Sequence, residues 1–261
     1  TPNPCIECNR SVKFARLLAE SDALGFAALA TGHYARITRV GDSLYLQKGL
    51  DESKDQSYVL YTIGRESLPR LRFPLGALRK SEVRELAVAN GFVTAGKRDS
   101  QDVCFVPDGD YAAFMERCSG AAYPPGEFVD VNGNVLGRHD GAVRFTVGQR
   151  RGLGVSHSER LYVKGKCGST VTLAPERELY SRTLLADGVN VLVPDALSSP
   201  FRCCAKIRYR HAEQPCIAEL VAPDTLRVEF DSPQRAITPG QAVVLYDGVT
   251  VVAGATATAA R

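Results

Sequence analysis

The hydrophobic pattern of this chain changes near its midpoint, and that change restricts the folds available to it. Before residue 119, apolar residues such as Phe14 and Leu18 recur at helical spacing, and residues 26–30 form one continuous apolar run. After residue 126, apolar residues occur in short runs separated by Gly, Pro and Asp. Helical spacing around a buried strand is typical of an α/β region, whereas regularly spaced short strands are typical of a sandwich or barrel. We therefore expect an α/β region followed by an all-β half.

The α/β region is expected to present a loop at the end of a buried strand. The apolar run at residues 26–30 suits a strand that is covered on both faces of a parallel sheet. Thr31, Gly32 and His33 follow this run directly. Open α/β sheets bind ligands at the carboxyl ends of their strands, so these residues are candidates for a site. A hydrogen-bonded loop histidine is the ordinary alternative for His33.

Three helices are expected in the same region. One begins at Ser81, whose hydroxyl would cap it, and ends before Gly91. Another follows Asp108 or Asp110, with Phe114 and Met115 facing inward. The first covers residues 10–20, and its apolar side consists of Val12, Phe14, Ala15, Leu17 and Leu18.

The all-β half is expected to contain two domains. A stretch rich in Gly and Pro at residues 120–126 marks the first boundary. We predict an α/β domain over residues 1–118, a small β-rich central domain over 119–183 and a C-terminal β-barrel over 184–261. The tail from Gly254 is either a last strand or a frayed end. Strands are expected at residues 161–163, 171–173, 189–193, 204–209, 217–221, 226–230 and 242–246.

Composition excludes several classes of protein. The chain has 261 residues, 44% of them hydrophobic and 23% charged, which is ordinary for a globular protein and excludes a disordered or collagen-like chain. No apolar run is long enough to span a membrane, and the N-terminus does not resemble a secretory signal, so we expect a cytoplasmic protein with no membrane partner. The formal net charge of +3 permits nucleic acid as a partner without requiring it. The single methionine is Met115, so we expect a processed or truncated chain.

Cysteines are the first candidates for chemistry. Cys5 and Cys8 form a C-x-x-C pair that precedes a predicted helix, whose N-terminus favours a thiolate. Half of a zinc site, a thioredoxin-like redox pair and one reactive thiol with a distant partner all remain open. The sequence contains no second C-x-x-C or histidine pair for zinc. Cys104 lies beside Val103 and Phe105, and its ordinary interpretation is a small buried hydrophobic residue.

Polar and basic segments are candidates for binding nucleic acid. In the polar run at residues 51–57, Lys54 and Gln56 suit a phosphate or a base, although a solvated turn before a helix is the alternative. Residues 138–166 contain seven Lys or Arg and two acidic residues, and Arg150 and Arg151 lie in a Gly-rich loop that suits a phosphate backbone. A charged surface is the alternative there. In a second basic run, strand alternation would place Lys206, Arg208 and Arg210 on one face, beside the aromatic Tyr209.

Seven segments occur here in an order that resembles the tRNA-specific 2-thiouridylase family. They cover nearly the whole chain, and their ordered occurrence is far more specific than any one of them. The segments are TPNPCIECN at residues 1–9, ATGHYAR at 30–36, KDQSY at 54–58, DSQDVCF at 99–105, TVGQRRGLG at 146–154, RY at 208–209 and TPGQ at 238–241.

The resemblance implies a fold and an activity. The fold is a PP-loop ATP-pyrophosphatase domain of the adenine nucleotide α-hydrolase type, a small central domain and a C-terminal β-barrel. The activity is ATP-dependent sulfur transfer to the wobble uridine of tRNA, giving 2-thiouridine, by way of an adenylated uridine and a cysteine persulfide. ATP and Mg²⁺ are the implied cofactors, and tRNA and a persulfide-carrying sulfur donor protein are the implied partners.

The resemblance also implies residue roles. Cys8 matches the nucleophile and Cys104 the persulfide carrier, and the two would form a transient disulfide. Gly32 matches an ATP-contacting glycine. No metal ligand is assigned. The segment that meets the target base is matched by Asn3, Pro4 and Cys5. The tRNA-contacting positions are matched by His33, Lys54, Asp55, Gln56, Arg208, Tyr209 and Gln241, to which the basic loop adds Arg150 and Arg151.

The chain departs from the family pattern in two places. Many members have Asp, a candidate general acid or base, at the position of Cys5. The Ser-Gly-Gly-x-Asp-Ser loop, which the family has upstream of TPNP, does not occur in this sequence. We therefore expect a truncated chain that does not bind ATP competently by itself. The alternatives are a catalytically silent tRNA-binding module and a thiol oxidoreductase that uses Cys5 and Cys8 without RNA.

Overall fold

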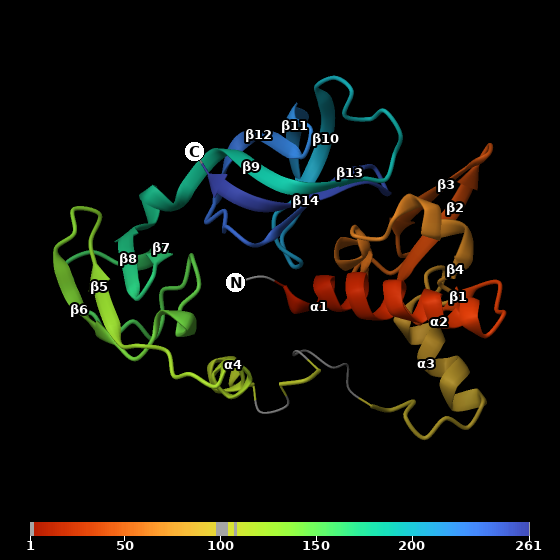
Figure 1. Ribbon diagram of the computed structural model, residues 1–261, viewed down its shortest axis with the longest axis horizontal. Helices are drawn as coiled ribbons and strands as arrows, with labels where there is room; N and C mark the ends of the chain where they lie inside the picture. The colour runs from red at the N-terminus through yellow and green to blue at the C-terminus, as the bar shows by residue number, and fades with distance from the viewer. Residues whose placement is uncertain (1–2, 98–103, 107–108, 261) are drawn as a thin grey trace.

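The computed structural model describes residues 3–97, 104–106 and 109–260. An α/β part, a small central sheet and a C-terminal barrel follow one another along the chain, which confirms the predicted fold class (Figure 1). Residues 1–2 of the TPNP segment, residues 99–103 of the DSQDVCF segment and the alternative cap Asp108 lie outside the described residues. No helix in the described part of the chain has the length and apolarity that a membrane span requires.

One long helix, bent into three segments, opens the chain. It consists of α1 (Pro4–Glu7), the π-helical segment η1 (Cys8–Arg16) and α2 (Leu17–Ala23), so it begins earlier than predicted. Phe14 and Leu18 are buried, as expected, but Val12 and Leu17 are exposed. The prediction therefore assigned too many residues to the buried apolar side of this helix. Gly25 follows the helix with a φ of +75°, a conformation that glycine adopts without steric cost.

The predicted strand at residues 26–30 is much shorter in the structure. Only β1 (Leu29–Ala30) is extended, and it pairs in parallel with β4 (Leu71–Arg72). The backbone N–H of Phe26 instead donates to Ser21 O of the preceding helix, and the Phe26 side chain is exposed. The prediction of a strand covered on both faces was wrong, because Leu29 is only half-buried and Ala30 is exposed.

The rest of the α/β part is a hairpin, two 3₁₀ turns and two helices. The hairpin consists of β2 (Ala35–Val40) and β3 (Ser43–Lys48), and the turns are η2 (Ser57–Leu60) and η3 (Arg65–Arg70). The helices are α3 (Lys80–Ala89) and α4 (Tyr111–Ser119).

The predicted caps of these helices have different outcomes. Ser81 does not cap α3. The N-cap is Arg79, whose backbone N–H donates to the Glu82 carboxylate. Gly91 follows the C-cap with a φ of +70°, and Asp110 caps α4 by accepting a hydrogen bond from Ala113 N, so these two predictions are confirmed.

The central part is a four-stranded sheet in the order β6-β5-β8-β7. Phe128, His139 and Phe145 pack edge to face or tilted at the centre of its core. The predicted runs at residues 161–163 and 171–173 are parts of β7 and β8, whereas β5 and β6 were not predicted. The strands are β5 (Gly126–Val129), β6 (Val135–His139), β7 (Leu161–Cys167) and β8 (Thr170–Pro175), with short 3₁₀ turns η4 (Ala142–Arg144) and η5 (Glu176–Leu179).

The C-terminal part is a closed six-stranded barrel. Its order is β13-β10-β11-β12-β9-β14, and pairing between β13 and β14 closes the ring. The tail from Gly254 belongs to the last strand of the barrel and is not a frayed end. β10 ends at Lys206, so Arg208 and Arg210 lie in a loop and their predicted strand alternation was wrong. The strands are β9 (Tyr180–Val191), β10 (Phe201–Lys206), β11 (Gln214–Ala222), β12 (Thr225–Arg235), β13 (Ala242–Asp247) and β14 (Thr250–Ala260).

The barrel and the α/β part are built against each other. Thr250 of β14 pairs with Gln47 of β3, which continues the barrel sheet into the β2–β3 hairpin. The Tyr58 hydroxyl donates to Ala242 O at 2.8 Å. Side chains from β13, including Tyr246, belong to the same buried cluster as Phe14 and Tyr58. The shared core therefore fixes the loops of one part relative to the loops of the other.

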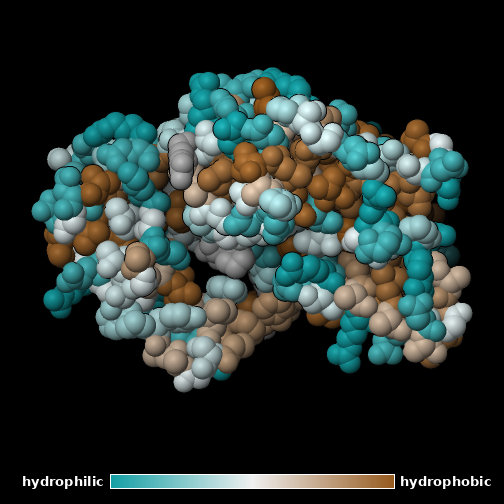
Figure 2. Space-filling model, turned by 45° about the horizontal axis from the view of Figure 1, so that its top comes forward, coloured by the Kyte–Doolittle hydropathy of each residue, from teal (hydrophilic) through white to brown (hydrophobic). Residues whose placement is uncertain are grey.

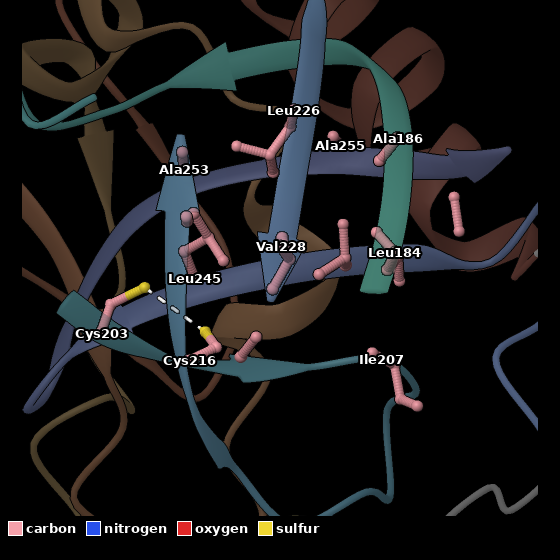
Figure 3. Packing of buried hydrophobic residues seen from close by; sticks show 14 of the residues in the cluster. Leu184, Ala186, Cys203, Ile207, Cys216, Leu226, Val228, Leu245, Ala253 and Ala255 are labelled. Carbon is pink, nitrogen blue, oxygen red and sulfur yellow. Dashed lines mark hydrogen bonds between the residues drawn. The ribbon is translucent and has the colours of Figure 1, made fainter. Parts of the chain in front are cut away.

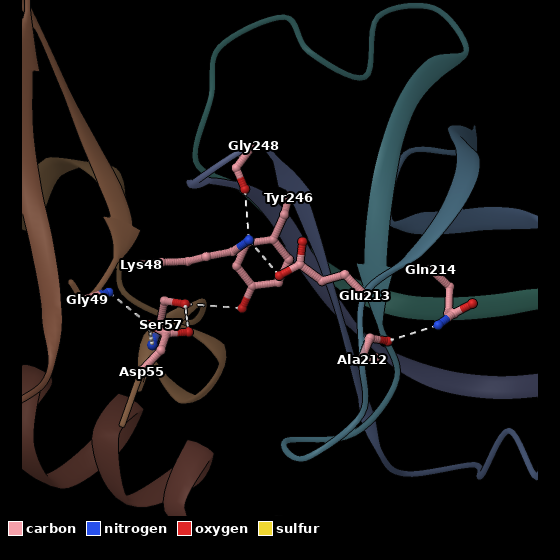
Figure 4. A network of polar contacts seen from close by, with 9 residues as sticks. All are labelled: Lys48, Gly49, Asp55, Ser57, Ala212, Glu213, Gln214, Tyr246 and Gly248. Carbon is pink, nitrogen blue, oxygen red and sulfur yellow. Dashed lines mark hydrogen bonds and ion pairs between the residues drawn. The ribbon is translucent and has the colours of Figure 1, made fainter. Parts of the chain in front are cut away.

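A polar network also links the barrel to the α/β part (Figure 4). The Lys48 ammonium forms an ion pair with Glu213 at 2.5 Å, donates to Gly248 O at 2.8 Å and lies over the Tyr246 ring. Ser57 Oγ donates to the Asp55 carboxylate at 2.8 Å and lies 3.2 Å from the Tyr246 hydroxyl. Loops at residues 51–57 and 206–213 are therefore held side by side.

Candidate functional site

A cavity of about 790 Å³ lies between these two loops. It is lined by residues 52–56 of the α/β part and residues 209–212 of the barrel, together with Lys80 and Lys206. Five of the residues predicted for the site meet here, namely Gly32, Lys54, Asp55, Gln56 and Tyr209. Residues far apart in the sequence thus form one site.

The charge of the cavity is positive. Four lysine or arginine side chains line it, against the carboxylates of Glu52 and Asp55. His211, the histidine of the wall, has a pKa that burial and the nearby Arg208 lower, so it is neutral at pH 7. The cations are Lys54, Lys80, Lys206 and Arg210. A cavity with this excess suits a polyanion such as an RNA backbone.

The loop at residues 51–56 is fixed by its own side chains. Asp55 Oδ1 accepts the N–H of Gly49 at 2.9 Å, and Gln56 Oε1 accepts the N–H of Tyr34 at 2.9 Å. Asp51 accepts hydrogen bonds from the Ser53 hydroxyl and from the N–H groups of Lys80 and Ser53, and these bonds lower the pKa of its carboxyl group. Asp55 and Gln56 therefore shape the cavity wall, and neither is a free surface side chain.

Gly49 is required for this arrangement. A Cβ at Gly49 would lie 2.8 Å from Tyr34 O, closer than real contacts allow. The backbone of the hairpin end can therefore lie against the strand after His33 only because this residue has no side chain.

His33 is buried behind the cavity wall. It packs against Phe14 and Phe73, and its Nδ1 lies 2.8 Å from Thr31 Oγ1. Burial, followed by the neighbouring Lys13 ammonium, lowers its pKa to about 4, so the ring is neutral at pH 7. The interpretation as a hydrogen-bonded loop histidine is thus confirmed, and His33 supports the wall from the inside.

Tyr209 connects the barrel loop to the opposite wall. Its hydroxyl donates to Asp55 O at 3.1 Å, and its ring lies 6.0 Å from the ring of Tyr58. The Lys206 ammonium lies over that Tyr58 ring. The aromatic and cationic side chains of the second basic run therefore interleave, although Tyr209 lies in the loop after β10 and not in a strand.

Three thiols lie close to this cavity. Burial raises the pKa of Cys5, and the thiol groups of Cys104 and Cys8 raise it further, which places all three near one another. Burial raises the pKa of Tyr209, and Asp55 and the Cys5 thiol raise it further, so Cys5 lies near the barrel loop. Cys8 and Cys104, which were predicted to act together, thus both lie near Cys5, and their pairing stays a prediction.

The burial and the bonding of Cys8 and Cys104 test what was predicted for them. Cys8 is half-buried, Cys104 is exposed, and neither forms a disulfide. The interpretation of Cys104 as a buried hydrophobic residue was therefore wrong. Within residues 3–97, 104–106 and 109–260, no three His, Cys, Asp or Glu side chains are grouped to hold a metal ion.

Asn3 and Pro4 begin the helix that carries Cys5 and Cys8. The Asn3 side chain caps α1 by accepting a hydrogen bond from Cys5 N at 3.0 Å, and Pro4 is the first helical residue, where its lack of an N–H costs nothing. Asn3 and Pro4 therefore set the start of the helix and with it the position of both thiols.

Arg208 does not line the cavity. Its guanidinium donates to Val147 O at 3.3 Å, to Ala236 O and to Thr238 Oγ1 at 3.0 Å, so it ties the Gly-rich loop of the central part to the barrel. Gly148 is needed at the same contact, because it has a φ of +87° and a Cβ would lie 3.0 Å from that of Ala236.

Three further predicted residues lie outside the cavity. Arg150 and Arg151 are exposed on the Gly-rich loop, as the prediction of a charged binding loop requires. Gln241 is half-buried at the entrance to β13, and its backbone bonds to Thr238 O and Ala257 N. Figure 2 shows the surface hollowed between the central part and the rest of the molecule.

Sequence reasoning did not assign Lys80, Lys206, Arg210 and His211 to the site. The last three belong to the basic run that was noted, and their position beside Tyr209 was the available signal. Lys80 has no such signal, because only the fold brings the start of α3 to the cavity.

Comparison with protein families covers all three parts of the chain. Residues 1–108 match the family described as tRNA methyl transferase HUP domain, residues 112–174 the tRNA methyl transferase PRC-barrel domain, and residues 181–257 the aminomethyltransferase beta-barrel domain. These ranges follow the three structural parts.

Several curated proteins are similar over almost the full length of this chain, and each is named tRNA-specific 2-thiouridylase MnmA. The protein of Geobacter metallireducens is 48% identical over 97% of this chain and 70% of its own length. That of Syntrophotalea carbinolica is 47% identical over 97% and 72%. That of Carboxydothermus hydrogenoformans is 45% identical over 98% and 71%. The chain belongs to the tRNA-specific 2-thiouridylase family.

Proposed function

We propose that this protein transfers sulfur to tRNA, converting the wobble uridine to 2-thiouridine. The observation that carries the proposal is the basic cavity between residues 52–56 and 209–212, with the thiols of Cys5, Cys8 and Cys104 beside it. The relatives that carry the name 2-thiouridylase support the substrate class.

The cavity holds the tRNA strand in this proposal. Lys54, Lys80, Lys206 and Arg210 attract backbone phosphates, and the exposed Arg150 and Arg151 extend the positive surface onto the central part. The Tyr209 ring offers a surface on which a base can stack. Asp55, Gln56 and His33 keep the wall in shape, while Arg208, Gly148 and Gln241 hold the barrel entrance and the Gly-rich loop in place.

Sulfur passes through two cysteines. Cys104 accepts a persulfide sulfur from a donor protein, which suits its exposure. The Cys8 thiolate then attacks the inner sulfur of the persulfide, forming a Cys8–Cys104 disulfide and releasing hydrosulfide, which attacks C2 of the uridine. The disulfide requires the two Cα atoms to approach within about 4.4–6.8 Å, and an external dithiol reduces it after each turnover. Burial and the nearby Cys104 and Cys8 thiols raise the pKa of Cys5, which disfavours its thiolate.

ATP fits this site only in part. Gly32 is exposed near the carboxyl end of β1 and lines the cavity, and a Cβ there would meet Leu75 Cδ1 at 3.5 Å, so the exposed backbone of Gly32 can lie against a nucleotide. ATP would convert the uridine 2-oxygen into a leaving group by adenylation. The described residues do not include a group of ligands suited to Mg²⁺, so we assign no step to the metal.

The test is thiolation of an unmodified tRNA transcript by the full-length protein carrying Cys104→Ser. We expect the 2-thiouridine product to be lost while tRNA binding is retained, and Cys118→Ser, an exposed cysteine on α4, should leave the product unchanged. Undiminished product from Cys104→Ser would refute the persulfide role. Binding by the wild-type protein without any product would instead favour a silent tRNA-binding module.

A further inference from the structure

Two cysteines of the barrel face each other in its core, away from the thiols near the cavity. Cys203 on β10 and Cys216 on β11 are direct partners in the antiparallel register, and their Sγ atoms are 3.6 Å apart (Figure 3). Both side chains are buried among Leu245, Val228 and other apolar residues. The site is therefore a buried pair of thiols in contact.

The backbone already suits a disulfide at this position. Directly opposed residues of antiparallel strands have Cα atoms about 4.5 or 5.5 Å apart, depending on whether they form a hydrogen-bonded pair. Both values lie within the roughly 4.4–6.8 Å range of disulfides. Closing the sulfur atoms to bonding distance therefore requires side-chain rotation and a small approach of the strands, without a change of register.

The neighbouring Cys204 lacks this geometry. It lies opposite Pro215, and successive side chains of a strand point to opposite faces. Its half-exposed thiol therefore points away from the core that contains Cys203 and Cys216. Cys204 is accessible but has no cysteine opposite it, which makes it a matched control.

A disulfide between these two cysteines would constrain one wall of the cavity. Residues 203 and 216 enclose the β10–β11 connection, which carries Lys206, Tyr209 and Arg210 of the cavity wall. A covalent bond between the two strands would close this loop at its base. The bond would then join the two ends of this loop covalently, whatever ligand the cavity binds.

We propose that Cys203 and Cys216 are an oxidisable dithiol, a modification site at which a hydroperoxide or a disulfide oxidant forms an intrachain disulfide. With hydrogen peroxide, one thiol is first oxidised to a sulfenic acid with release of water. The second thiol attacks the sulfenic sulfur, the S–S bond forms and a second water leaves. Two thiols are oxidised by two electrons in total, and one peroxide is reduced to two waters.

Burial makes this reaction slow in the folded protein. The hydrogen bond between the two thiols and their burial raise the pKa of Cys216, so little thiolate is present at neutral pH. We therefore expect the bond to form faster when β10 and β11 separate, either during refolding or in mild denaturant. Once formed, the buried disulfide is protected from reductants in the same way.

The test is to refold the full chain in a mixture of reduced and oxidised glutathione, block free thiols and map the peptides under non-reducing conditions. We expect a cross-linked peptide pair containing Cys203 and Cys216 and a midpoint of thermal unfolding that is higher by roughly 5–10 °C than that of the reduced protein, as for closure of a loop of this size. Dithiothreitol should reverse both effects when it is added in mild denaturant, where β10 and β11 separate.

Two variants complete the test. Cys204→Ser should retain the cross-link and the shift, whereas Cys216→Ser should lose both. The proposal is overturned if Cys203 and Cys216 are recovered as free thiols when Cys5, Cys8 or Cys104 is oxidised, or if Cys204 is found bonded to Cys216. Neither outcome depends on tRNA binding or thiolation.

Discussion

Arg208 is the predicted RNA contact that the structure uses most clearly for another purpose. Its half-buried guanidinium donates to two backbone carbonyls and one hydroxyl, and burial lowers its pKa. Arg208→Ala leaves Val147 O, Ala236 O and Thr238 Oγ1 without this donor. Hydrogen bonds from a charged group contribute about 1.5–3 kcal/mol each, but Thr238 Oγ1 also bonds to Ala236 O, so the three losses do not add fully.

We expect Arg208→Ala to lower the free energy of unfolding by about 2–4 kcal/mol. At about 2–4 °C per kcal/mol for a chain of this size, the midpoint of thermal unfolding should fall by roughly 5–15 °C. Differential scanning calorimetry without tRNA measures this directly. The control is Arg150→Ala on the same contact loop, where an exposed side chain is removed and the midpoint should change by less than about 2 °C.

An unchanged unfolding temperature of Arg208→Ala would contradict this structural role. If Arg208→Ala unfolds at the wild-type temperature and loses only tRNA affinity, the guanidinium does not tie the central part to the barrel. Arg208→Lys sharpens the comparison, because it keeps the charge for a phosphate but its ammonium lies one bond short of Nη2, the guanidinium nitrogen that makes all three contacts. It should be destabilised nearly as much as Arg208→Ala.

Three other perturbations follow from the geometry. Replacing Arg150 and Arg151 by Glu should weaken tRNA binding and reduce the slope of log K against log salt concentration by about 1.4–1.8, measured by filter binding between 50 and 200 mM salt; an unchanged slope would place the RNA elsewhere. Gly148→Ala should destabilise the protein by about 1–3 kcal/mol in urea unfolding, because of its φ of +87° and the Cβ contact with Ala236; a wild-type midpoint would contradict this. The folded pKa of His33, about 4, lies below its ordinary value of 6.5, so the unfolded chain binds more protons between these values and stability falls as the pH falls. Lowering the pH from 7 to 5 should cost about 2 kcal/mol through this group, and His33→Gln should remove that part of the pH dependence.

The sequence predicted the order of the parts well but not how they join. Strand-like runs and turn residues identified most barrel strands, because alternation and Gly or Pro punctuation are local signals. The pairing of β14 with β3 and the packing of Tyr246 with Phe14 and Tyr58 are contacts between distant residues. Local patterns do not encode such contacts, so the shared core was not predicted.

Errors within elements have specific physical causes. Residues 26–30 read as a strand covered on both faces, but Phe26 N bonds back to the helix and only two residues reach β4. The basic run after Lys206 alternates like a strand, yet it leaves the sheet as a loop. In both cases a short apolar or alternating run was compatible with two structures, and the tertiary partner decided between them.

The candidate site was predicted as a set of residues, and the structure assigns them to different tasks. Gly32, Lys54 and Tyr209 line the cavity, while His33 and Arg208 support its surroundings. The motif resemblance identifies residues that belong together but does not distinguish a side chain that faces a ligand from one that positions the wall. Burial and hydrogen-bond partners make that distinction.

The central claim is that the wobble region of a tRNA enters the basic cavity beside the three thiols. A tRNA carrying 5-bromouridine at the wobble position, cross-linked by light to the full-length protein and mapped by mass spectrometry, tests it most directly. The account predicts cross-links to peptides containing residues 3–8, 52–56 or 206–212. Cross-links confined to the β5–β6 hairpin of the central sheet, residues 126–139, would contradict it.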